Sequence, residues 1–286
     1  MEIRLLDKHN RAAVGRFLDR LESDRGRPAL GESKFVDFDG PFRGRGLVAH
    51  EASSIVGYAH VLWHAAGGVW EMEVAAADEL PDAALATLVA TARSQADGEL
   101  LWWTFGAGPE QAFAARHYPA YRSLHKLSGP LPPPEPATIP PGIRIAPFQV
   151  GVDEPAWLEV NNAAFAGHAE NGQWTMAEIT ERQSRAWFSA DGFRLAWLDD
   201  NLAGFCWTKV HDGGVGEIHV VGVHPAFQGR GIGRAIVVEA LWYLAGIGCN
   251  VGMLYVDTTN TSALALYQSL GLGLERVDIC FEVPNA

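Results

Sequence analysis

The chain contains, over residues 216–234, the stretch Gly216-Glu217-Ile218-His219-Val220-Val221-Gly222-Val223-His224-Pro225-Ala226-Phe227-Gln228-Gly229-Arg230-Gly231-Ile232-Gly233-Arg234. Its apolar run predicts a central strand, which His224-Pro225 ends, and a long helical pattern follows over 235–245. In a strand, glycine-rich turn and helix of this kind, backbone N–H groups and the helix N-terminus converge on an anion. We therefore expect the turn to bind a pyrophosphate.

The side chains of this turn agree with that expectation. Gly229, Gly231 and Gly233 allow the backbone to approach phosphate oxygens closely, and Arg230 and Arg234 add positive charge. No Gly-Lys-Ser/Thr follows, so a Walker-type nucleotide loop is excluded. The turn is also not placed in a first βαβ unit with a later ribose-binding acid, which argues against dinucleotide binding.

The turn, with Val-x-Pro before it, resembles the signature of the GNAT acetyltransferases. A second stretch supports this, in which Leu254-Tyr255-Val256-Asp257 precedes Asn260 and a helical pattern with Tyr267. The resemblance implies the acyl-CoA N-acyltransferase fold and acetyl-CoA as co-substrate. The backbone of the strand end would pair with the pantetheine arm, as an added strand does. The implied acetyl-CoA contacts are Val221, Gly222, Val223, Gln228, Gly229, Arg230, Gly231, Ile232, Gly233, Arg234, Asn260 and Ala263.

The same resemblance implies the catalytic residues. Glu217 occupies the position where the family places its general base, and Tyr267 is placed to protonate the CoA thiolate. Because a Glu ordinarily titrates near ~4.3 and an α-amino group near ~8, burial or a water relay would have to raise the effective basicity. His219 is a rival base, since it shares a strand face with Glu217. The alternatives are an exposed carboxylate for Glu217 and core packing for Tyr267.

A more specific resemblance, to the mycothiol synthases of actinobacteria, suggests the acceptor. It is carried by 161–175, 207–211, 216–220 and 267–271. It implies acetylation of the cysteinyl amine of a cysteinyl-glucosaminyl-inositol. The implied substrate contacts are Glu32, Glu170, Lys209, Glu217 and Tyr255. Two other functions stay open: a GNAT enzyme for another small-molecule amine, and a non-catalytic acyl-CoA-binding regulator. Residues 161–175 could also be a helix end and a structural loop, with Thr175 capping the next helix.

A proline-rich stretch, 130–141, divides the chain into near-equal halves. We expect a degenerate GNAT-like domain over 1–129, a linker over 130–141 and a catalytic GNAT domain over 142–286. The halves look like diverged copies: each begins with a strand, continues with two helical patterns and paired strands, and closes with a strand, a short helix and a last strand. This order predicts α/β domains with a mixed sheet.

The first half departs from the family at its own anion site. Where glycines and arginines should follow the strand that ends at Val74, residues 75–84 contain no glycine. Asp78, Glu79 and Asp82 there would repel a pyrophosphate. We predict that the first half is non-catalytic and binds no CoA.

Composition sets the remaining expectations. A net charge of −12 over 286 residues argues against a nucleic-acid partner. The three cysteines are widely spaced in apolar runs, which predicts buried free thiols in a reducing cytoplasm and neither a disulfide framework nor a metal site. No apolar run is long enough to span a bilayer, and no signal peptide is visible. We expect a cytoplasmic monomer.

Overall fold

A computed structural model describes residues 1–64, 67–166 and 172–285. Its contacts divide the chain into two compact units. Unit 1 contains Met1–Leu124 and Arg276–Ala286, and unit 2 contains His125–Glu275. Each unit is a mixed sheet with helices on its faces, as the sequence predicts.

The two halves of the sequence repeat one order of elements. In the first half these are β1 (Glu2–Leu5), α1 (Arg11–Arg25), α2 (Glu32–Asp39), β2 (Arg45–Glu51), β3 (Ser54–His64), β4 (Val69–Ala76), α3 (Asp82–Arg93), β5 (Leu100–Phe105), α4 (Pro109–His117) and β6 (Ala120–Pro130). In the second half they are β7 (Ile143–Pro147), α5 (Glu154–Ala164), α6 (Met176–Gln183), β8 (Phe193–Leu198), β9 (Asn201–His211), β10 (Val215–Val223), α7 (Ile232–Gly246), β11 (Val251–Asp257), α8 (Thr261–Ser269) and β12 (Gly273–Glu282). Two short 3-10 turns, Asp212–Gly214 and Pro225–Phe227, flank β10. The described residues therefore confirm the internal repeat.

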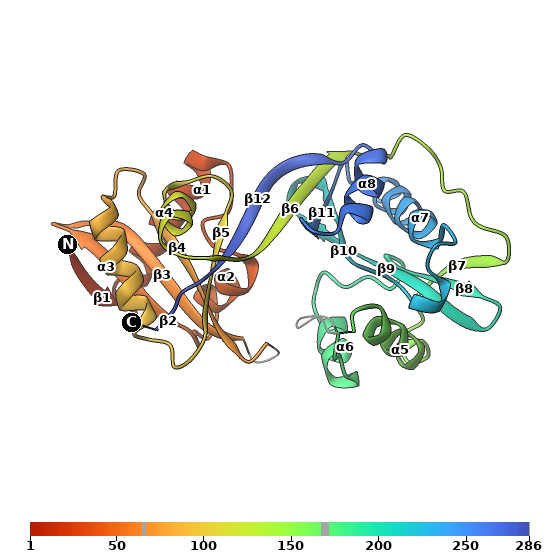
Figure 1. Ribbon diagram of the computed structural model, residues 1–286, viewed down its shortest axis with the longest axis horizontal. Helices are drawn as coiled ribbons and strands as arrows, with labels where there is room; N and C mark the ends of the chain where they lie inside the picture. Colours follow the sequence, from red (N-terminus) through yellow and green to blue (C-terminus); the bar gives the residue numbers. More distant parts are fainter. Residues whose placement is uncertain (65–66, 167–171, 286) are drawn as a thin grey trace. The chain divides into compact units, whose positions relative to one another are not determined.

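Unit 2 is built on strands in the order β6-β11-β10-β9-β8-β7. The pair β10–β11 is parallel, because α7 connects the two strands, whereas β9 and β8 are antiparallel to their neighbours. Figure 1 shows α7 and α8 over one face of this sheet and α5 and α6 over the other.

Each face of the unit 2 sheet has its own core. On the α7 face, Cys206, Ile218 and Tyr267 pack with the apolar side of α7. On the α5–α6 face lies a cluster of aromatic rings, in which Trp157 and Trp207 are fully buried. The rings of Phe193 and Trp207 stack with their centroids 4.5 Å apart. Aromatic pairs of this kind add about 0.5–1.5 kcal/mol each beyond the area they bury, so they fix this face of the sheet firmly.

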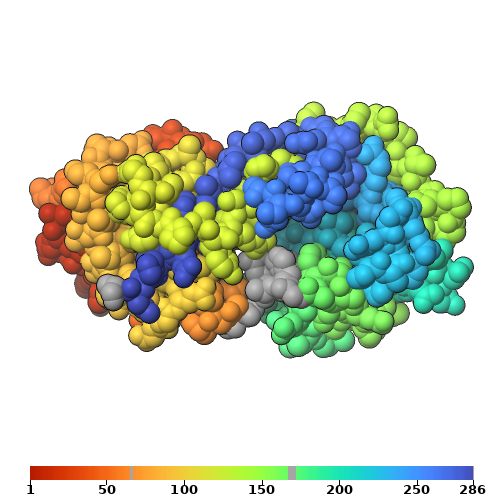
Figure 2. Space-filling model, viewed as in Figure 1, coloured from red at the N-terminus to blue at the C-terminus, as the bar shows by residue number. Residues whose placement is uncertain are grey.

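Unit 1 takes its last strand from the end of the chain. Its strand order is β1-β2-β3-β4-β5-β12, and β12 pairs with β5 from Asp278↔Phe105 to Glu282↔Leu101. Val283 N donates to Leu100 O at 2.9 Å, and Figure 2 shows the blue C-terminal residues lying against yellow residues of unit 1. The last strands of the two sequence halves are thus exchanged: β6 lies beside β11 and β12 beside β5.

The proline-rich stretch is packed against unit 2. Leu131 N donates to Asn250 O at 2.9 Å, and Trp242 Nε1 of α7 donates to Glu135 O at 3.0 Å. The contacts group this stretch with unit 2 and Arg276–Ala286 with unit 1. The domain boundaries expected from the sequence, 1–129, 130–141 and 142–286, stay a prediction.

Candidate functional site

The strand β10 separates from β11 halfway along its length. Their parallel pairing runs from Val215↔Val251 to Ile218↔Leu254, where the paired positions of these two described strands end. At the same place the pairing of β10 with β9 shifts register between Ile218 and Val220, which is a β-bulge. Beyond it, Val221–Val223 stay paired with β9 only. The edge of β10 that faces β11 is therefore available to an extended ligand from Val220 onward.

The glycine-rich loop follows directly on this strand. Gly229 and Gly231 have φ angles of 76° and 78°, in the left-handed region that favours glycine. Gly231 is the N-cap of α7, so the first N–H groups of that helix have no intrahelical partner. Gln228 Nε2 closes the loop by donating to Val223 O at 3.1 Å. The strand edge of Val221–Val223 and the first N–H groups of α7 thus lie at the two ends of this loop.

Cationic side chains lie on both sides of the loop. The Arg230 guanidinium lies 5.5 Å from the ring centroid of Phe227. Arg234 donates to Ser269 Oγ at 2.7 Å and lies 3.8 Å from the exposed carboxylate of Glu135. Both arginines are exposed, so an anion at the loop can reach them.

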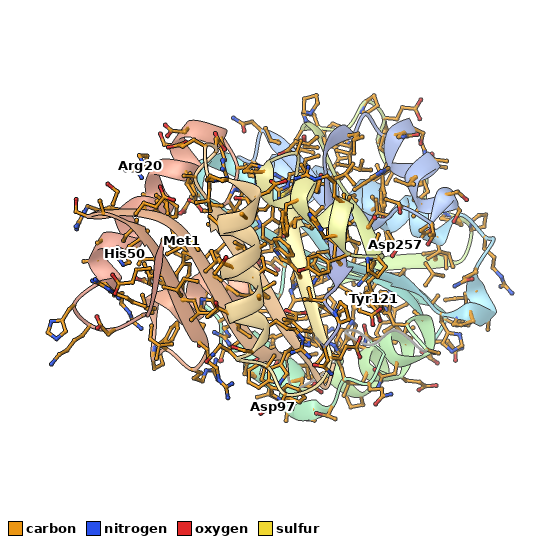
Figure 3. The ribbon with its side chains drawn as sticks, turned by 60° about the vertical axis from the view of Figure 1, so that its left-hand side comes forward. Met1, Arg20, His50, Asp97, Tyr121 and Asp257 are labelled. Carbon is orange, nitrogen blue, oxygen red and sulfur yellow. The ribbon has the colours of Figure 1, made fainter. Side chains whose placement is uncertain are left out.

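The segment after β11 brings Asn260 and Tyr267 to the α7 face. β11 ends at Asp257, which Figure 3 labels, and Asn260 caps α8 by accepting from Ala263 N at 3.1 Å. Tyr267 is 6% exposed among the residues of the α7 core. Burial, followed by the nearby Cys206 thiol, raises the pKa of the Tyr267 phenol above its ordinary value. The phenol is therefore protonated at neutral pH and can act as a proton donor.

The residues predicted to contact the acceptor substrate lie on the opposite face of the unit 2 sheet, the α5–α6 face. Glu217 pairs with Lys209 on β9 and with Met253 on β11, and directly paired residues point to the same side of a sheet. Tyr255, two residues after Met253, lies on that side also, 42% exposed. Lys209 is buried, and its Nζ lies 5.2 Å from the ring centroid of Trp187. The structure therefore brings Glu217, Lys209 and Tyr255 to one face beside the strand separation.

Two imidazoles hold the Glu217 carboxylate. His211 Nε2 lies 2.6 Å from Glu217 Oε2, and His219 Nδ1 lies 3.2 Å from Glu217 Oε1. Burial acts to raise the pKa of Glu217, but the hydrogen bonds and charges of the two histidines outweigh it and lower the pKa to about 2. At neutral pH the group is a buried carboxylate that only accepts hydrogen bonds.

Sequence reasoning missed His211 and Trp187. His211 lies six residues from Glu217, and only the hairpin register, which pairs His211 with Val215, turns both side chains to one face. The two glycines of the turn, Gly213 and Gly214, could have indicated that hairpin. Trp187 comes from the loop after α6 and meets the edge of His219 with ring centroids 5.1 Å apart. Nothing in its local sequence marks it.

Some predicted contacts fall elsewhere. Glu170 lies outside the described residues, as does 167–171 as a whole. Asn162 lies before that segment and Trp174 after it. Asn162 Nδ2 donates to Trp174 O at 2.9 Å, and Asn162 Oδ1 accepts from Trp174 N at 3.0 Å. Thr175 N donates to Glu178 at 2.6 Å at the start of α6. Glu32 is the first residue of α2 and belongs to unit 1.

In unit 1 the backbone at the end of β4, at Ala76, is already occupied. Ala76 N donates to Glu110 Oε1 at 2.8 Å, and Ala76 O accepts from Arg25 Nη2 at 2.6 Å. Arg25 Nη1 also donates to Glu110 Oε1 at 2.9 Å, and both side chains are buried. The pairing of β4 with β5 ends at Glu73↔Trp103, so Glu110 and Arg25 lie where the strands separate. They occupy the edge that the equivalent strand of unit 2 leaves open.

Three further properties concern the described residues as a whole. The thiols of Cys206, Cys249 and Cys280 are buried, as the apolar runs around them predict. Within 1–64, 67–166 and 172–285, no helix is long and apolar enough to cross a membrane. Across these same ranges, no group of three or more His, Cys, Asp or Glu side chains is arranged to hold a metal ion.

Comparison with known sequences matches residues 156–272 to the acetyltransferase (GNAT) family. Curated relatives of this chain carry the name mycothiol acetyltransferase. The relative from Thermomonospora curvata is 41% identical over 85% of this chain and 83% of its own length. The relative from Kocuria rhizophila is 37% identical over 92% of both chains. These matches extend through both halves of the sequence.

Solved structures show the same fold over the whole chain. A GCN5-related N-acetyltransferase from Sphaerobacter thermophilus matches with a TM-score of 0.77 and 20% identity, over 100% of this chain and 96% of that one. A tandem GNAT protein from the clavulanic acid biosynthesis pathway matches with a TM-score of 0.67 and 18% identity, over 100% of both chains. Both likenesses concern the fold alone.

Proposed function

We propose that this chain, which belongs to the mycothiol acetyltransferases of the GNAT family, acetylates the cysteinyl amine of a cysteinyl-glucosaminyl-inositol to give mycothiol. The chain is an acetyl-CoA-dependent N-acetyltransferase. The observation that carries the proposal is the end of the β10–β11 pairing at Ile218, next to Glu217. The C-terminal half of β10 thereby offers a free edge for acetyl-CoA, the acetyl donor. The N-terminal half of β10 carries a polar face for the acceptor amine.

The donor is held by backbone groups. The pantetheine arm lies along the free edge of Val221–Val223, and the pyrophosphate lies on the loop 228–234 at the N-terminus of α7. Asn260 and Ala263, at the start of α8, flank the arm. The thioester of acetyl-CoA bound in this way lies near the β-bulge, within reach of the faces that bear Glu217 and Tyr267.

The acceptor lies on the α5–α6 face. Its sugar and inositol hydroxyls accept hydrogen bonds from Lys209 and Tyr255, and they donate hydrogen bonds to carboxylates, for which Glu170 and Glu32 are the candidates. Glu217 is the general base that accepts the amine proton, and Tyr267 protonates the leaving thiolate from the opposite face.

The test is CoA release by the purified chain with the cysteinyl amine, against a panel of polyamines, aminoglycosides and peptide N-termini. We expect kcat/KM to be highest for the cysteinyl amine. Equal or higher values for another amine would assign the enzyme to that acceptor. Tight CoA binding without acetylation of any amine, unchanged by Glu217→Gln, would instead indicate a regulator.

We also infer that the enzyme works as a cytoplasmic monomer without a nucleic-acid partner. The net charge of −12 and the three buried free thiols support this. Sedimentation of the purified chain at micromolar concentration tests the monomer, and a mass of twice 31.0 kDa would contradict it.

A further inference from the structure

The ring of Trp187 lies against the ammonium group of Lys209, one of the residues expected to contact the acceptor. Lys209 Nζ lies 5.2 Å from the ring centroid, within the distance at which the face of an indole attracts a cation. We propose that Trp187 is a positioning residue for the acceptor: its ring face holds the Lys209 ammonium in the orientation in which it donates to the acceptor's hydroxyl groups. The proposal rests on the proposed acetyl transfer and adds a residue to the acceptor site.

Trp187 lies in the loop between α6 and β8, and hydrogen bonds hold this loop on both sides of it. Phe188 N donates to Arg185 O at 3.0 Å, which closes a turn around Trp187. Ser189 Oγ lies 3.1 Å from the hydroxyl oxygen of Tyr243, a residue of α7. The indole ring is therefore presented from a backbone whose position is fixed within unit 2, which a positioning residue requires.

The Trp187 ring joins the aromatic cluster to the polar groups of the acceptor face. Its centroid lies 5.6 Å from that of Trp207 and 5.1 Å from that of His219, whose ring plane is inclined at 70° to it. Trp157, on the same side of the sheet, is different: it is fully buried, and its described ring contacts are all with other aromatic side chains. Trp187 is only half-buried. Its polar partners therefore distinguish it from a tryptophan that only fills the core.

The ammonium of Lys209 needs such a partner because the backbone alone does not set its direction. A lysine carries its charge at the end of a flexible four-carbon chain. Lys209 is 5% exposed and lies opposite Glu217 in the register of β9 and β10. Fixing its rotamer before the acceptor arrives lowers the entropy lost on binding. The ring face attracts the charge as a whole, so the N–H groups can still turn toward the acceptor's hydroxyls.

Steady-state kinetics on full-length variants tests this role. Trp187→Leu keeps an apolar side chain but removes the π face. We expect it to raise the KM of the acceptor about tenfold with a smaller effect on kcat, because the contact acts on acceptor binding. Trp187→Phe restores an aromatic face and should recover most of the loss. Unchanged acetyl-CoA affinity, measured by calorimetry, shows that both variants are folded.

The neighbouring Phe188 offers a matched control. It lies in the same loop, is also half-buried, and has its ring centroid 5.8 Å from that of Trp207. Phe188→Leu should therefore cost similar packing while leaving the KM of the acceptor near the wild-type value. An equal rise of KM in Phe188→Leu and Trp187→Leu would reduce Trp187 to a packing residue and overturn the proposal.

A double-mutant cycle shows whether Trp187 acts through Lys209. Lys209→Met should raise the KM of the acceptor, and adding Trp187→Leu should raise it little further, because the ammonium that the ring holds is already absent. Effects of the two substitutions that multiply would overturn the proposal. So would a wild-type KM in Trp187→Leu, or a loss confined to kcat, which would mean that the ring acts through His219 and Glu217 instead.

NMR of the lysine side chains tests the contact without any substrate. The chain has four lysines, which are Lys8, Lys34, Lys126 and Lys209. A chain labelled with ¹³C-lysine therefore gives a simple spectrum, in which the Lys209 signals are those that Lys209→Met removes. Because protons above an aromatic face are shifted upfield, the ε-CH₂ signal of Lys209 should move downfield in Trp187→Leu and stay in place in Phe188→Leu. An unchanged signal in Trp187→Leu would overturn the proposal.

Failure of the proposed function has a different outcome. A wild-type chain inactive toward the cysteinyl amine but active toward another amine contradicts the proposed acceptor only. The lysine signals need no acceptor, and the KM of that other amine in the same variants then supports or overturns the role of Trp187.

Discussion

His211 Nε2 lies 2.6 Å from Glu217 Oε2, although six residues and a hairpin turn separate the two along the chain. The contact anchors a carboxylate that is buried between two strands and carries no compensating proton. Burying a charge is costly unless hydrogen bonds satisfy it, and here the two imidazoles do so. The contact with His211 therefore stabilises the buried charge of Glu217, and it also lowers the basicity of the carboxylate.

This relationship predicts how stability depends on pH. Because the pKa of Glu217 is about 2 in the folded chain, below the ordinary 4.5, its ionised form favours folding by about 3 kcal/mol above pH 4.5. That contribution is lost as the pH falls from about 4.5 toward 2. Urea unfolding should therefore show wild type more stable than Glu217→Gln at pH 7, with the difference shrinking at pH 3. A difference that stays constant between the two pH values would contradict the low pKa.

Removing the Tyr267 hydroxyl should slow the chemical step. For Tyr267→Phe we expect kcat to fall by about 10²-fold, because the thiolate loses its proton donor, while acetyl-CoA affinity stays the same. Tyr243→Phe is the matched control: its hydroxyl contacts Ser189 Oγ at 3.1 Å, away from the strand separation. Steady-state kinetics on both variants checks this. Equal kcat values for the two would rule out Tyr267 as the acid.

The loop glycines should differ in their tolerance of a side chain. Gly229 has space around an added Cβ but a φ of 76°, so Gly229→Ala is strained by about 1–2 kcal/mol. Gly233 lies in α7, where an added Cβ would meet Val223 Cγ2 at an ordinary 3.5 Å. We expect Gly229→Ala to weaken acetyl-CoA binding by roughly tenfold and Gly233→Ala to change it less. Calorimetric titration measures both, and the reverse order would refute a role for the left-handed turn.

Unit 1 should bind no acetyl-CoA, because Glu110 and Arg25 already occupy the backbone of Ala76. Calorimetry should therefore give one acetyl-CoA per chain, and a stoichiometry of two would disprove this prediction. Arg25→Met leaves the buried Glu110 carboxylate with the Ala76 N–H and with Arg27, whose Nη2 lies 3.6 Å from Glu110 Oε2. Loss of one member of a buried ion pair costs about 3–5 kcal/mol, so this variant should unfold at clearly lower urea concentration than Arg20→Met. Arg20 is exposed on α1 and serves as the control.

The amino-acid sequence by itself determined the strand, glycine-rich turn and helix of unit 2 and the repeated order of elements. The loop 228–234 is local: strand, glycine-rich turn and helix follow one another within 20 residues, so periodicity and turn chemistry are sufficient to predict it. The acidic, glycine-free segment after Val74 is local for the same reason. Glu217 and Tyr267 followed from a family resemblance, and their roles stay a prediction.

Only the tertiary structure decided which side chains meet Glu217 and where the last strands lie. The contacts of Glu217 with His211, and of Lys209 and His219 with Trp187, depend on hairpin register and on a loop from beyond α6. The exchange of β6 and β12 between the sheets depends on pairing between strands far apart in sequence. A local pattern shows that a segment is a strand and which face is apolar. It does not show which partner completes its hydrogen bonds, because every exposed strand edge offers the same backbone donors and acceptors.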